Sequence, residues 1–419
     1  MSDPEPHTKT LLIIGFMWPE PKATAAGGRM MQLIHFFINH DYSITFACAA
    51  SETERTSDLD SLGVKKIHIK LNHASFDDFL VGLNPGLVLF DRFMIEEQFG
   101  WRVARSAPNA LRILETQDLH SLRISRQEAL KRGAIFSVGD WLGHETTKRE
   151  IASIYRSDLS LVLSSFELGI LRNTIGINSG LMLHLPFLMA PIHELTAANW
   201  LGFEARSDFI CIGNGKHAPN VDSVVWLKKG IWPILHKALP KAVIHVYGAY
   251  LPQKITQLND SSTGFFVRGW ATDAYEVMGK ARVNLAPLRF GAGIKGKLID
   301  AMCTGTPNVT TTIGAEGMRG ERPWNGEIAD DPEAFAHAAI KLYCDREAWQ
   351  MAQYNGIKII NELYDKNKLD RVFHSKLKKV RDDLESHRSQ NFIGGMLWHH
   401  TMASTKYMSK WIEAKQVVP

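Results

Sequence analysis

Short, almost continuous apolar runs recur along the first half of the chain, and stretches with helical periodicity separate them. Such runs, rich in Val, Ile and Leu and without alternation, are typical of parallel strands that are covered on both faces. Helical stretches between them include Arg29–Asn39 and Arg123–Arg132. This alternation predicts a parallel α/β domain. Its strands are expected at Leu11–Phe16, Ser43–Ala49, Lys66–Leu71, Leu87–Phe93, Leu111–Thr116, Leu159–Ser164 and Leu181–Phe187.

The alternation starts again in the second half of the chain. A chain of 419 residues is too long for one hydrophobic core. We therefore predict two doubly wound domains, at 1–195 and 205–375, with the boundary between Pro186 and Arg206. Strands of the second domain are expected at Asp208–Asn214, Ala242–Ala249, Gly264–Gly269, Arg282–Leu288 and Asn308–Thr312. Helices are expected at Ser223–Leu239, Asp273–Gly279, Leu298–Cys303, Pro332–Asp345 and Trp349–Glu362.

Composition narrows the class of protein. Hydrophobic residues make up 45% of the chain and charged residues 22%, as in ordinary soluble globular proteins. The net charge of +4 is a weak basic excess, and no nucleic-acid-binding module is visible, so nucleic acid is not an expected partner. No run approaches the roughly 18–20 apolar residues that span a bilayer, and the stretch Met1–Thr10 has no apolar signal core.

The cysteines point to a reducing compartment. All four lie far apart in the sequence and lack the spacing of metal ligands, so we expect buried reduced thiols, no metal site and a cytoplasmic location. They are Cys48, Cys211, Cys303 and Cys344.

The most informative segment runs from Arg289 to Pro307. It follows an apolar run, mixes three glycines with three cations, and then takes up a helical pattern at Leu298. A strand, a glycine-rich turn and a helix start form an anion site, because free amides and the helix dipole both favour negative charge. Lys295 and Lys297, with Arg289 before the turn, match a diphosphate better than a carboxylate. The alternative is an ordinary strand-to-helix turn with a basic, solvated face.

A nucleotide-binding P-loop is disfavoured. Gly291, Gly296 and Lys297 match the opening of the Walker pattern. The next residue should then be Ser or Thr, to hold Mg²⁺, but it is Leu298.

The segment instead resembles the donor-binding motif of GT-B glycosyltransferases, in the large retaining group of bacterial polysaccharide and lipopolysaccharide enzymes (group 1). The matching residues are Lys295, Lys297, Asp300, Ala301, Met302, Gly305 and Pro307, followed by the stretch Thr311–Met318. One departure is Ala292, which stands where the family often carries the first of two acids.

The resemblance implies an architecture and a donor. Two Rossmann-like domains should face each other across a cleft, and the C-terminal helices, at 376–419, should cross back onto the first domain. The donor should be a UDP or GDP sugar, with no other cofactor and no metal ion.

The resemblance also implies roles for single residues. Asp300 would hold the ribose, while Lys295, Lys297, Arg289 and the loop amides would stabilise the diphosphate during retaining transfer to an acceptor hydroxyl. The donor site would comprise Gly27, Gly28, Lys216, Trp270, Arg289, Gly291, Ala292, Gly293, Ile294, Asp300 and Glu316. Without the family match, Gly27 and Gly28 are equally explained as a flexible turn, and Trp270 as a core residue.

Polar residues at strand ends of the first domain indicate the acceptor side, because ligands of open α/β sheets bind at the carboxyl ends of strands. Asp91 and Arg92 are either a structural ion pair or part of this side. Asp118, His120 and Arg123 form the densest polar group there. Asp118 or His120 would hold the acceptor hydroxyl or accept its proton; the alternative is a helix cap with an exposed His.

Two further features have simpler explanations. Ser164 and Glu167 have the spacing of a capping box, so we assign Glu167 no chemistry. The C-terminal tail mixes aromatic residues with lysines, which indicates either contact with a membrane surface or, as we prefer, packing on the first domain. The residues concerned are Trp398, Tyr407, Met408, Lys410 and Trp411.

The sequence therefore predicts a glycosyltransferase that acts on a glycan, lipid-linked or protein acceptor in bacterial glycan synthesis. Two other classes stay open. An epimerase of GT-B shape would release free products, and a degenerate scaffold, which Ala292 keeps open, would turn over no nucleotide sugar.

Overall fold

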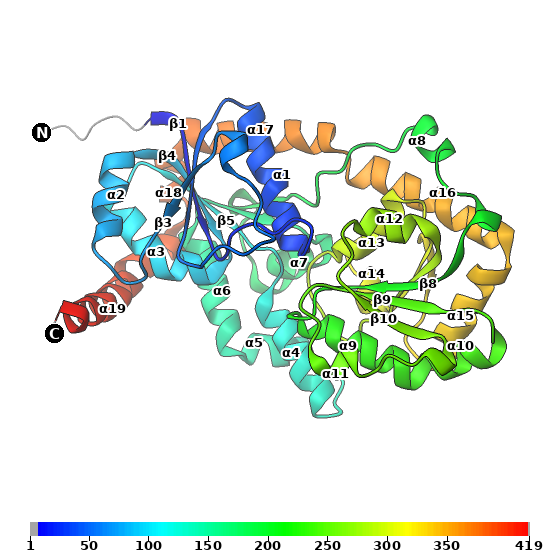
Figure 1. Ribbon diagram of the computed structural model, residues 1–419. Helices are drawn as coiled ribbons and strands as arrows, with labels where there is room; N and C mark the ends of the chain where they lie inside the picture. Colours follow the sequence, from blue (N-terminus) through cyan, green and yellow to red (C-terminus); the bar gives the residue numbers. More distant parts are fainter. Residues whose placement is uncertain (1–6, 418–419) are drawn as a thin grey trace, which may run out of the picture.

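The computed structural model describes residues 7–417, without the side chains at 7–8, 400–403 and 416–417. Two α/β domains stand side by side, the first blue and cyan and the second green and yellow in Figure 1. Every pair of neighbouring strands in their two sheets is parallel. The predicted fold class, two Rossmann-like domains, is confirmed.

The first sheet has seven strands in the order β3-β2-β1-β4-β5-β6-β7. Successive residues of the central strand β1 face opposite sides: Leu11 and Ile13 enter one hydrophobic core, and Leu12 and Ile14 the other. Apolar runs without alternation fold this way because both faces of the sheet are covered by helices. The strands are β1 (His7–Gly15), β2 (Ser43–Cys48), β3 (Lys65–His68), β4 (Pro85–Asp91), β5 (Leu111–Glu115), β6 (Leu159–Val162) and β7 (Met182–His184).

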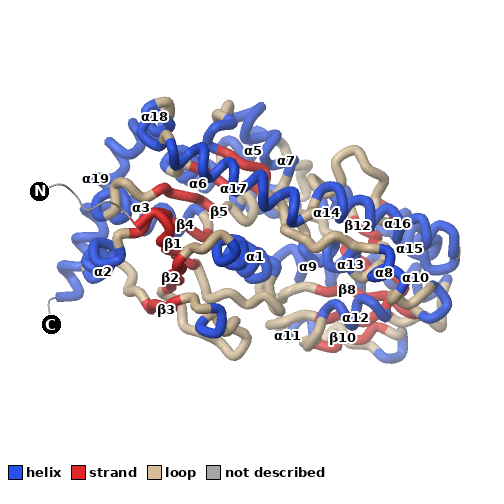
Figure 2. The backbone as a smooth tube through the Cα atoms, turned by 90° about the horizontal axis from the view of Figure 1, so that it is seen from above, coloured by secondary structure: helices blue, strands red, loops and turns tan. Residues whose placement is uncertain are grey.

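Helices lie on both faces of this sheet, as the view from above shows (Figure 2). They are α1 (Ala25–Asn39), α2 (Ser75–Leu83), α3 (Phe93–Ser106), α4 (His120–Lys131), α5 (Val138–Gly143), α6 (Glu145–Arg156) and α7 (Ser165–Ile170).

The second sheet has six strands in the order β10-β9-β8-β11-β12-β13. All five predicted strands are present, and the edge strand β13 was not predicted. Its three residues include Gly326 and are only half-buried, so they form no apolar run. The strands are β8 (Ser207–Ile212), β9 (Ile244–Tyr247), β10 (Phe265–Gly269), β11 (Ala281–Ala286), β12 (Asn308–Thr310) and β13 (Gly326–Ile328).

The helix expected at Ser223–Leu239 is two helices, α9 and α10, joined by a π-helical turn at Leu227–Ile231. The helices named below are α8 (Glu194–Ala198), α9 (Ala218–Trp226), α10 (Trp232–Ala238), α11 (Gln253–Thr256), α12 (Ala274–Lys280), α13 (Gly296–Cys303), α14 (Thr312–Ala315), α15 (Pro332–Cys344) and α16 (Arg346–Leu363).

The chain passes between the domains twice, and the two crossings touch. The Met189 amide donates to the Tyr364 carbonyl at 2.8 Å, and the Lys366 amide donates to the Met189 carbonyl at 2.8 Å. The chain then returns to the first domain through α17 (Lys366–Asp382), α18 (Leu384–Ser389) and α19 (Phe392–Val417) (Figure 1).

The return begins in α17, so the expected division at 376 falls inside that helix. Phe373 of α17 stacks on Phe36 of α1, with the ring centroids 4.4 Å apart. It belongs to the same core as β1. Most of α17 is thus an integral part of the first domain.

Candidate active site

A cavity of about 950 Å³ lies between the two domains. Its first-domain wall comes from the ends of β1, β4 and β5 and from the start of α1, and its second-domain wall from the ends of β8 and β9, the loop after β11, and α13. In both sheets the strand order reverses at this point, between β1 and β4 and between β8 and β11. That is where open α/β sheets bind their ligands.

Most of the predicted site residues line this cavity: Gly28, Arg92, Asp118, His120, Arg123, Lys216, Trp270, Gly291, Ala292, Ile294, Lys295, Lys297 and Asp300. The others, which the structure also describes, are not part of its wall: Gly27, Asp91, Arg289, Gly293 and Glu316.

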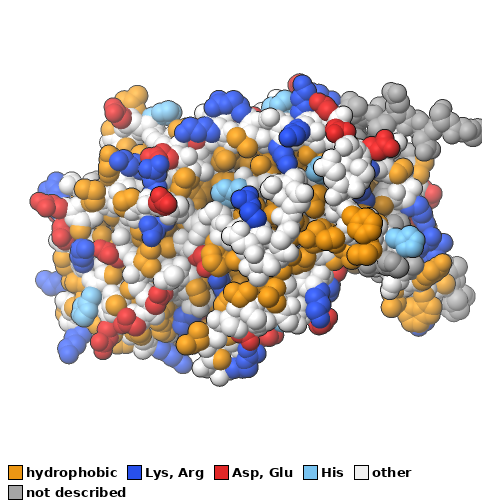
Figure 3. Space-filling view, turned by 180° about the vertical axis from the view of Figure 1, so that it is seen from behind, with side chains coloured by type: hydrophobic (Ala, Val, Ile, Leu, Met, Phe, Trp, Pro, Cys, Tyr) orange, Lys and Arg blue, Asp and Glu red, His pale blue; other side chains and the backbone are white. Residues whose placement is uncertain are grey.

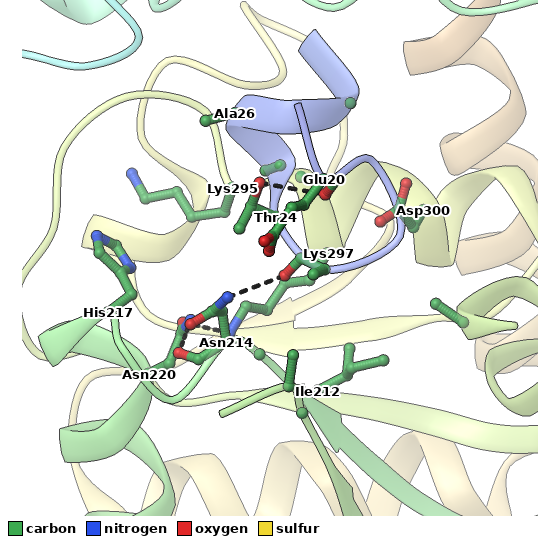
Figure 4. Close-up of a pocket in the computed structure, with 18 of the residues that line it drawn as sticks. Glu20, Thr24, Ala26, Ile212, Asn214, His217, Asn220, Lys295, Lys297 and Asp300 are labelled. Atoms are coloured by element: carbon green, nitrogen blue, oxygen red, sulfur yellow. Dashed lines mark hydrogen bonds between the residues drawn. The ribbon is translucent and has the colours of Figure 1, made fainter. Parts of the chain in front are cut away.

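The two predicted lysines lie at the start of α13, where Lys295 is buried and Lys297 is half-buried. Lys295 donates from Nζ to the Gly293 carbonyl at 2.9 Å, and Lys297 donates to Asn220 Oδ1 at 2.7 Å. Burial lowers the pKa of both ammonium groups, that of Lys295 to about 8. Figure 4 shows Lys295 on the same side of the pocket as His217, and Lys297 beside Asn220, with Ala26 of α1 and its capping residue Thr24 across the space. Two cations therefore lie at a helix N-terminus, an arrangement that favours a bound anion.

Arg289 was expected in this anion site, but it points elsewhere. Its guanidinium pairs with Asp222 of α9, Nε donating to Oδ2 at 2.9 Å, and about a third of its side chain is exposed. The arginine therefore ties the donor loop, residues 289–295, to α9.

Two more expectations for this loop are wrong in detail. The Gly293 amide does not face the cavity, because it donates to Glu167 Oε1 at 2.7 Å. Glu316 forms a bidentate pair with Arg126 of the first domain, with distances of 2.7 and 2.8 Å, in place of lining the donor site.

Asp300 lies on α13 one turn after Lys297, and its Oδ1 accepts a hydrogen bond from the hydroxyl of Tyr275 at 3.2 Å. Burial raises the pKa of Asp300 to about 7, and the Tyr275 hydrogen bond opposes that rise. Both residues line the cavity. Asp300 is half-buried, and a carboxylate whose described partner is a hydroxyl group suits the recognition of neutral hydroxyl groups.

Asp118, His120 and Arg123 form one polar group at the end of β5. Asp118 accepts from Arg123 Nε at 2.7 Å, and its Oδ1 lies 2.9 Å from His120 Nδ1. Burial would raise the pKa of Asp118, but Arg123 and His120 hold it well below its ordinary value. Burial would lower the pKa of His120, but Asp118 raises it above the ordinary value. The group thus favours an ionised carboxylate beside a protonated imidazole.

At the end of β4, Asp91 has a structural role, whereas Arg92 faces the cavity. Asp91 is structural, because it accepts from the Phe16 amide at 3.2 Å and from Gln117 Nε2 at 3.1 Å. Arg92 lies over the Phe16 ring at 4.7 Å and faces the cavity. Arg92 and Gln117 have φ angles of 78° and 62°, and such backbone strain gathers at functional sites.

The loop after β1 approaches the second domain closely. Thr24 caps α1 by accepting from the Gly27 amide at 2.9 Å, and Gly27 packs against the backbone of Glu20, where a Cβ would lie 2.6 Å from main-chain atoms. Gly27 is therefore needed for packing, and Gly28 faces the cavity. Asn214 Nδ2 donates to the Ala23 carbonyl at 3.1 Å across the cleft.

An aromatic wall closes the far end of the cavity. Lys216 Nζ lies 3.7 Å from the centroid of the Tyr250 ring. Arg55 of the first domain lies between Tyr250 and Trp270, at 4.8 and 5.0 Å from their ring centroids. The Tyr250 hydroxyl also reaches Glu20 across the cleft at 3.1 Å. Trp270 is half-buried, so it is a wall residue and not a core residue.

Several site residues were missed from the sequence. His217 follows Lys216 and lines the cavity; burial, then Arg123, lowers its pKa to about 4. The Asn214 and Asn220 side chains orient this turn: Asn220 Nδ2 donates to the Asn214 carbonyl at 3.0 Å. Both stand in the stretch Gly213–Asn220, whose polar character was the available signal. Arg126 gave no signal and Glu167 only that of a helix cap, because their partners Glu316 and Gly293 lie in the other domain.

Two Rossmann-like domains that face each other across a ligand cavity define the GT-B fold. The comparison by sequence then identifies the second domain: residues 206–345 match the family described as glycosyl transferases group 1. No curated protein matches the chain. The resemblance read from the donor loop is thereby confirmed for this domain.

Solved structures agree on the fold. Sucrose-phosphate synthase from Thermosynechococcus elongatus is 13% identical, with a TM-score of 0.65 over 89% of this chain and 99% of that chain. HepE from Anabaena, solved with UDP-glucose, is 14% identical, with a TM-score of 0.63 over 88% of this chain and 99% of that chain. A TarM mutant from S. aureus, solved with fondaparinux, alpha-GlcNAc-glycerol and UDP, is 14% identical, with a TM-score of 0.54 over 72% of this chain and 57% of TarM. This chain thus spans little more than half of TarM.

Two absences hold for the part of the chain that the structure describes. No group of three or more His, Cys, Asp or Glu side chains is placed to hold a metal ion. None of the helices in that part of the chain combines the length and the apolar character needed to cross a bilayer.

Proposed function

We propose that this protein is a glycosyltransferase that moves a sugar from a nucleoside diphosphate sugar to an acceptor hydroxyl. The observation that carries the proposal is the cavity between the domains, where Lys295, Lys297 and Asp300 meet at the start of α13. The group 1 match covers this segment. UDP is the first nucleotide to test, because TarM and HepE were solved with UDP or a UDP sugar.

The leaving diphosphate gains negative charge as the bond to the anomeric carbon breaks. Lys295 and Lys297 are fixed before that charge develops, so they would stabilise it more in the transition state than in the ground state. We propose that these two cations supply the stabilisation without a metal ion. Asp300 would accept hydrogen bonds from the ribose.

The acceptor oxygen would bond to the anomeric carbon on the face that the diphosphate leaves, so that configuration is retained. Its proton would pass to an oxygen of the leaving phosphate. Two pKa shifts support this route over a protein base. Asp118 raises the pKa of His120 and so favours the protonated imidazole, and the low pKa of Asp118 makes it a weak proton acceptor. These side chains, with Arg92, would orient the acceptor.

The acceptor would be a glycan, lipid-linked or protein substrate in bacterial glycan synthesis. A cytoplasmic reaction is supported by the four cysteines, which are free. Cys48 and Cys211 are buried as expected, but Cys303 is half-buried and Cys344 is exposed. We further propose that α19 contacts a membrane surface. Six exposed hydrophobic side chains support this: Phe392, Ile393, Met396, Tyr407, Met408 and Trp411.

Lys297→Ala tests the phosphate role. The variant should fold, because the Lys297 ammonium group donates to the neutral Asn220 side chain and removing it leaves no opposite charge unpaired. It should bind UDP at least roughly ten-fold more weakly and lose most turnover, because a cation at the proposed diphosphate site is gone. Thermal stabilisation by a panel of nucleotides and nucleotide sugars, with EDTA present, measures binding. A ligand at about one hundred times its Kd adds about 2.7 kcal/mol. Lys254→Ala, at an exposed lysine on α11, is the matched control.

The outcomes separate the three classes. Transfer to an added acceptor supports the transferase, and release of free sugar without transfer supports an epimerase. A flat panel with folded protein would support the scaffold. Normal UDP affinity and turnover in Lys297→Ala would contradict the phosphate role.

A further inference from the structure

Glu167 is a buried carboxylate that the proposed reaction does not use. It lies on α7 in the first domain and is 1% exposed. One of its oxygens, Oε1, accepts two backbone hydrogen bonds: from Leu119 at 3.0 Å and from Gly293 at 2.7 Å. Leu119 follows Asp118 in the first domain, whereas Gly293 is the centre of the donor loop. A single oxygen atom therefore joins the acceptor-side turn to the donor loop.

The same residue, Gly293, is also held through its carbonyl group. Lys295 Nζ donates to the Gly293 carbonyl at 2.9 Å. Gly293 itself has a φ of +64°, and a Cβ there would lie 2.8 Å from the Cβ of Asp118. The loop can approach Asp118 this closely only because the residue is glycine. Glu167 fixes the backbone from the first domain, and Lys295 fixes it from within the loop.

A second first-domain side chain holds the same loop. Arg126 of α4 donates to the Gly291 carbonyl at 2.8 Å while it pairs with Glu316. Backbone groups of the donor loop are thus paired with side chains of the opposite domain, and a buried backbone amide without a partner is costly.

We propose that Glu167 is a positioning residue that gives the donor loop its binding shape only when the two domains are closed. It does not line the cavity, so it acts through the Gly293 and Leu119 amides. When the domains separate, the Gly293 amide loses this acceptor and the loop relaxes. When the domains close, the donor site and the Asp118 turn form together. This inference rests on the proposed function for its meaning, but the coupling itself can be measured without any substrate.

Hydrogen exchange of the ligand-free protein is the direct test. In Glu167→Ala the amides of 289–295 and of 117–121 should both exchange at least roughly ten-fold faster than in the wild type. Glu167→Gln keeps an acceptor oxygen at the same place and should restore most of the protection. Glu150→Ala is the matched control: Glu150 is 2% exposed and accepts the amides of His120 and Ser121 within the first domain. Its effect should stay within the first domain and spare 289–295.

Binding and turnover give the second readout. Glu167→Ala should raise the Kd for UDP and lower kcat together, because one side chain sets both the loop and the Asp118 turn; Glu167→Gln should recover both. Unchanged exchange at 289–295 in Glu167→Ala would overturn the inference, as would faster exchange confined to 117–121. If Glu167→Ala does not fold, Glu167→Gln and Arg126→Ala carry the test, and Arg126→Ala should speed exchange at 289–295. A wild type that binds no nucleotide would contradict the proposed function but leave the exchange result standing.

Discussion

At the scale of single residues, the pairing of Tyr275 with Asp300 sets how the proposed ribose site responds to pH. The hydroxyl of Tyr275 donates to Asp300 and favours the ionised carboxylate, whose pKa burial raises to about 7. An ionised carboxylate accepts two ribose hydroxyls better than a protonated one. Affinity for UDP should therefore fall as the pH drops through about 7. In Tyr275→Phe the pKa should be higher, so the fall should begin at a higher pH.

The measurement compares UDP with its 2′,3′-dideoxy analogue. Both carry the same diphosphate. The Kd of the analogue divided by the Kd of UDP therefore reports the ribose contacts alone. We expect Tyr275→Phe to reduce that ratio about three- to ten-fold near neutral pH. Tyr354→Phe, at an exposed tyrosine of α16, is the control. A ratio that is independent of pH in the wild type would contradict the role of Asp300, and an unchanged ratio in Tyr275→Phe would contradict that of Tyr275.

Residue chemistry could be predicted where the signal is local. Lys297 and Asp300 follow a glycine-rich turn at helical spacing, and both line the cavity. Arg289 stands in the same segment, but its direction depends on Asp222, 67 residues earlier. Glu167 looked like a cap residue, and its backbone amide does bond to Ser164 at 3.5 Å. Its side chain crosses to Gly293, and a spacing rule cannot report a partner 126 residues away.

At the scale of elements, the C-terminal helix α19 has two different faces. One face packs on the first domain, where Trp398 Nε1 donates to the Arg156 carbonyl at 3.0 Å and Ser409 donates to Asn72 at 3.0 Å. Trp398 is therefore a packing residue and not a membrane contact. Hydrophobic side chains gather on the projecting helix, at the lower right of Figure 3. Packing of the tail on the first domain is thus confirmed, and contact with a membrane surface stays a prediction for the exposed face.

Charge on α19 favours an anionic lipid surface. Its one acid, Glu413, pairs with Arg102, whereas three lysines lie along the helix: Lys406, Lys410 and Lys415. Aromatic side chains and lysines on one helix suit the interfacial layer of a membrane. We expect the protein to sediment with phosphatidylserine vesicles, less so at high salt, and weakly with phosphatidylcholine.

The double variant Tyr407→Ser/Trp411→Ser should bind such vesicles at least roughly ten-fold more weakly while keeping its melting temperature. Leu195→Ser, at an exposed leucine of α8, is the control. Equal sedimentation of the double variant and the wild type would exclude α19 as the contact.

Elements were predictable where burial is two-sided. The apolar run Leu87–Phe93 predicted β4 correctly, because all seven residues of β4 are buried. The break between α9 and α10 could not be predicted from the sequence, because the helical pattern continues through Leu227 and Ile231, both of which are buried. β13 could not be predicted, because neighbouring elements and not its own sequence hold it at the sheet edge. It pairs with β12 through Asn308–Thr310.

At the scale of the whole molecule, contacts on both rims of the cavity hold the domains together. Tyr250 reaches Glu20 on one rim, and Arg126 pairs with Glu316 on the other. The exposed fractions of the Arg126 and Glu316 side chains are 6% and 15%. Removing one partner from a buried ion pair leaves an uncompensated charge, which typically costs about 3–5 kcal/mol. Arg126→Ala should therefore lower the free energy of unfolding by that order, as measured by urea denaturation.

Arg149→Ala is the matched control for this loss. Arg149 also forms a bidentate pair, with Glu97, at 3.0 and 2.6 Å, but within the first domain and with half of its side chain exposed. Exposed pairs contribute about 0–1 kcal/mol, so this variant should be nearly as stable as the wild type. The large loss in Arg126→Ala requires that the domains stay closed, because opening would let water reach Glu316. The Glu167–Gly293 and Tyr250–Glu20 contacts remain in that variant and should keep the small-angle scattering profile unchanged. An expanded profile with a loss no larger than that of Arg149→Ala would show that the Arg126–Glu316 pair alone holds the closed arrangement.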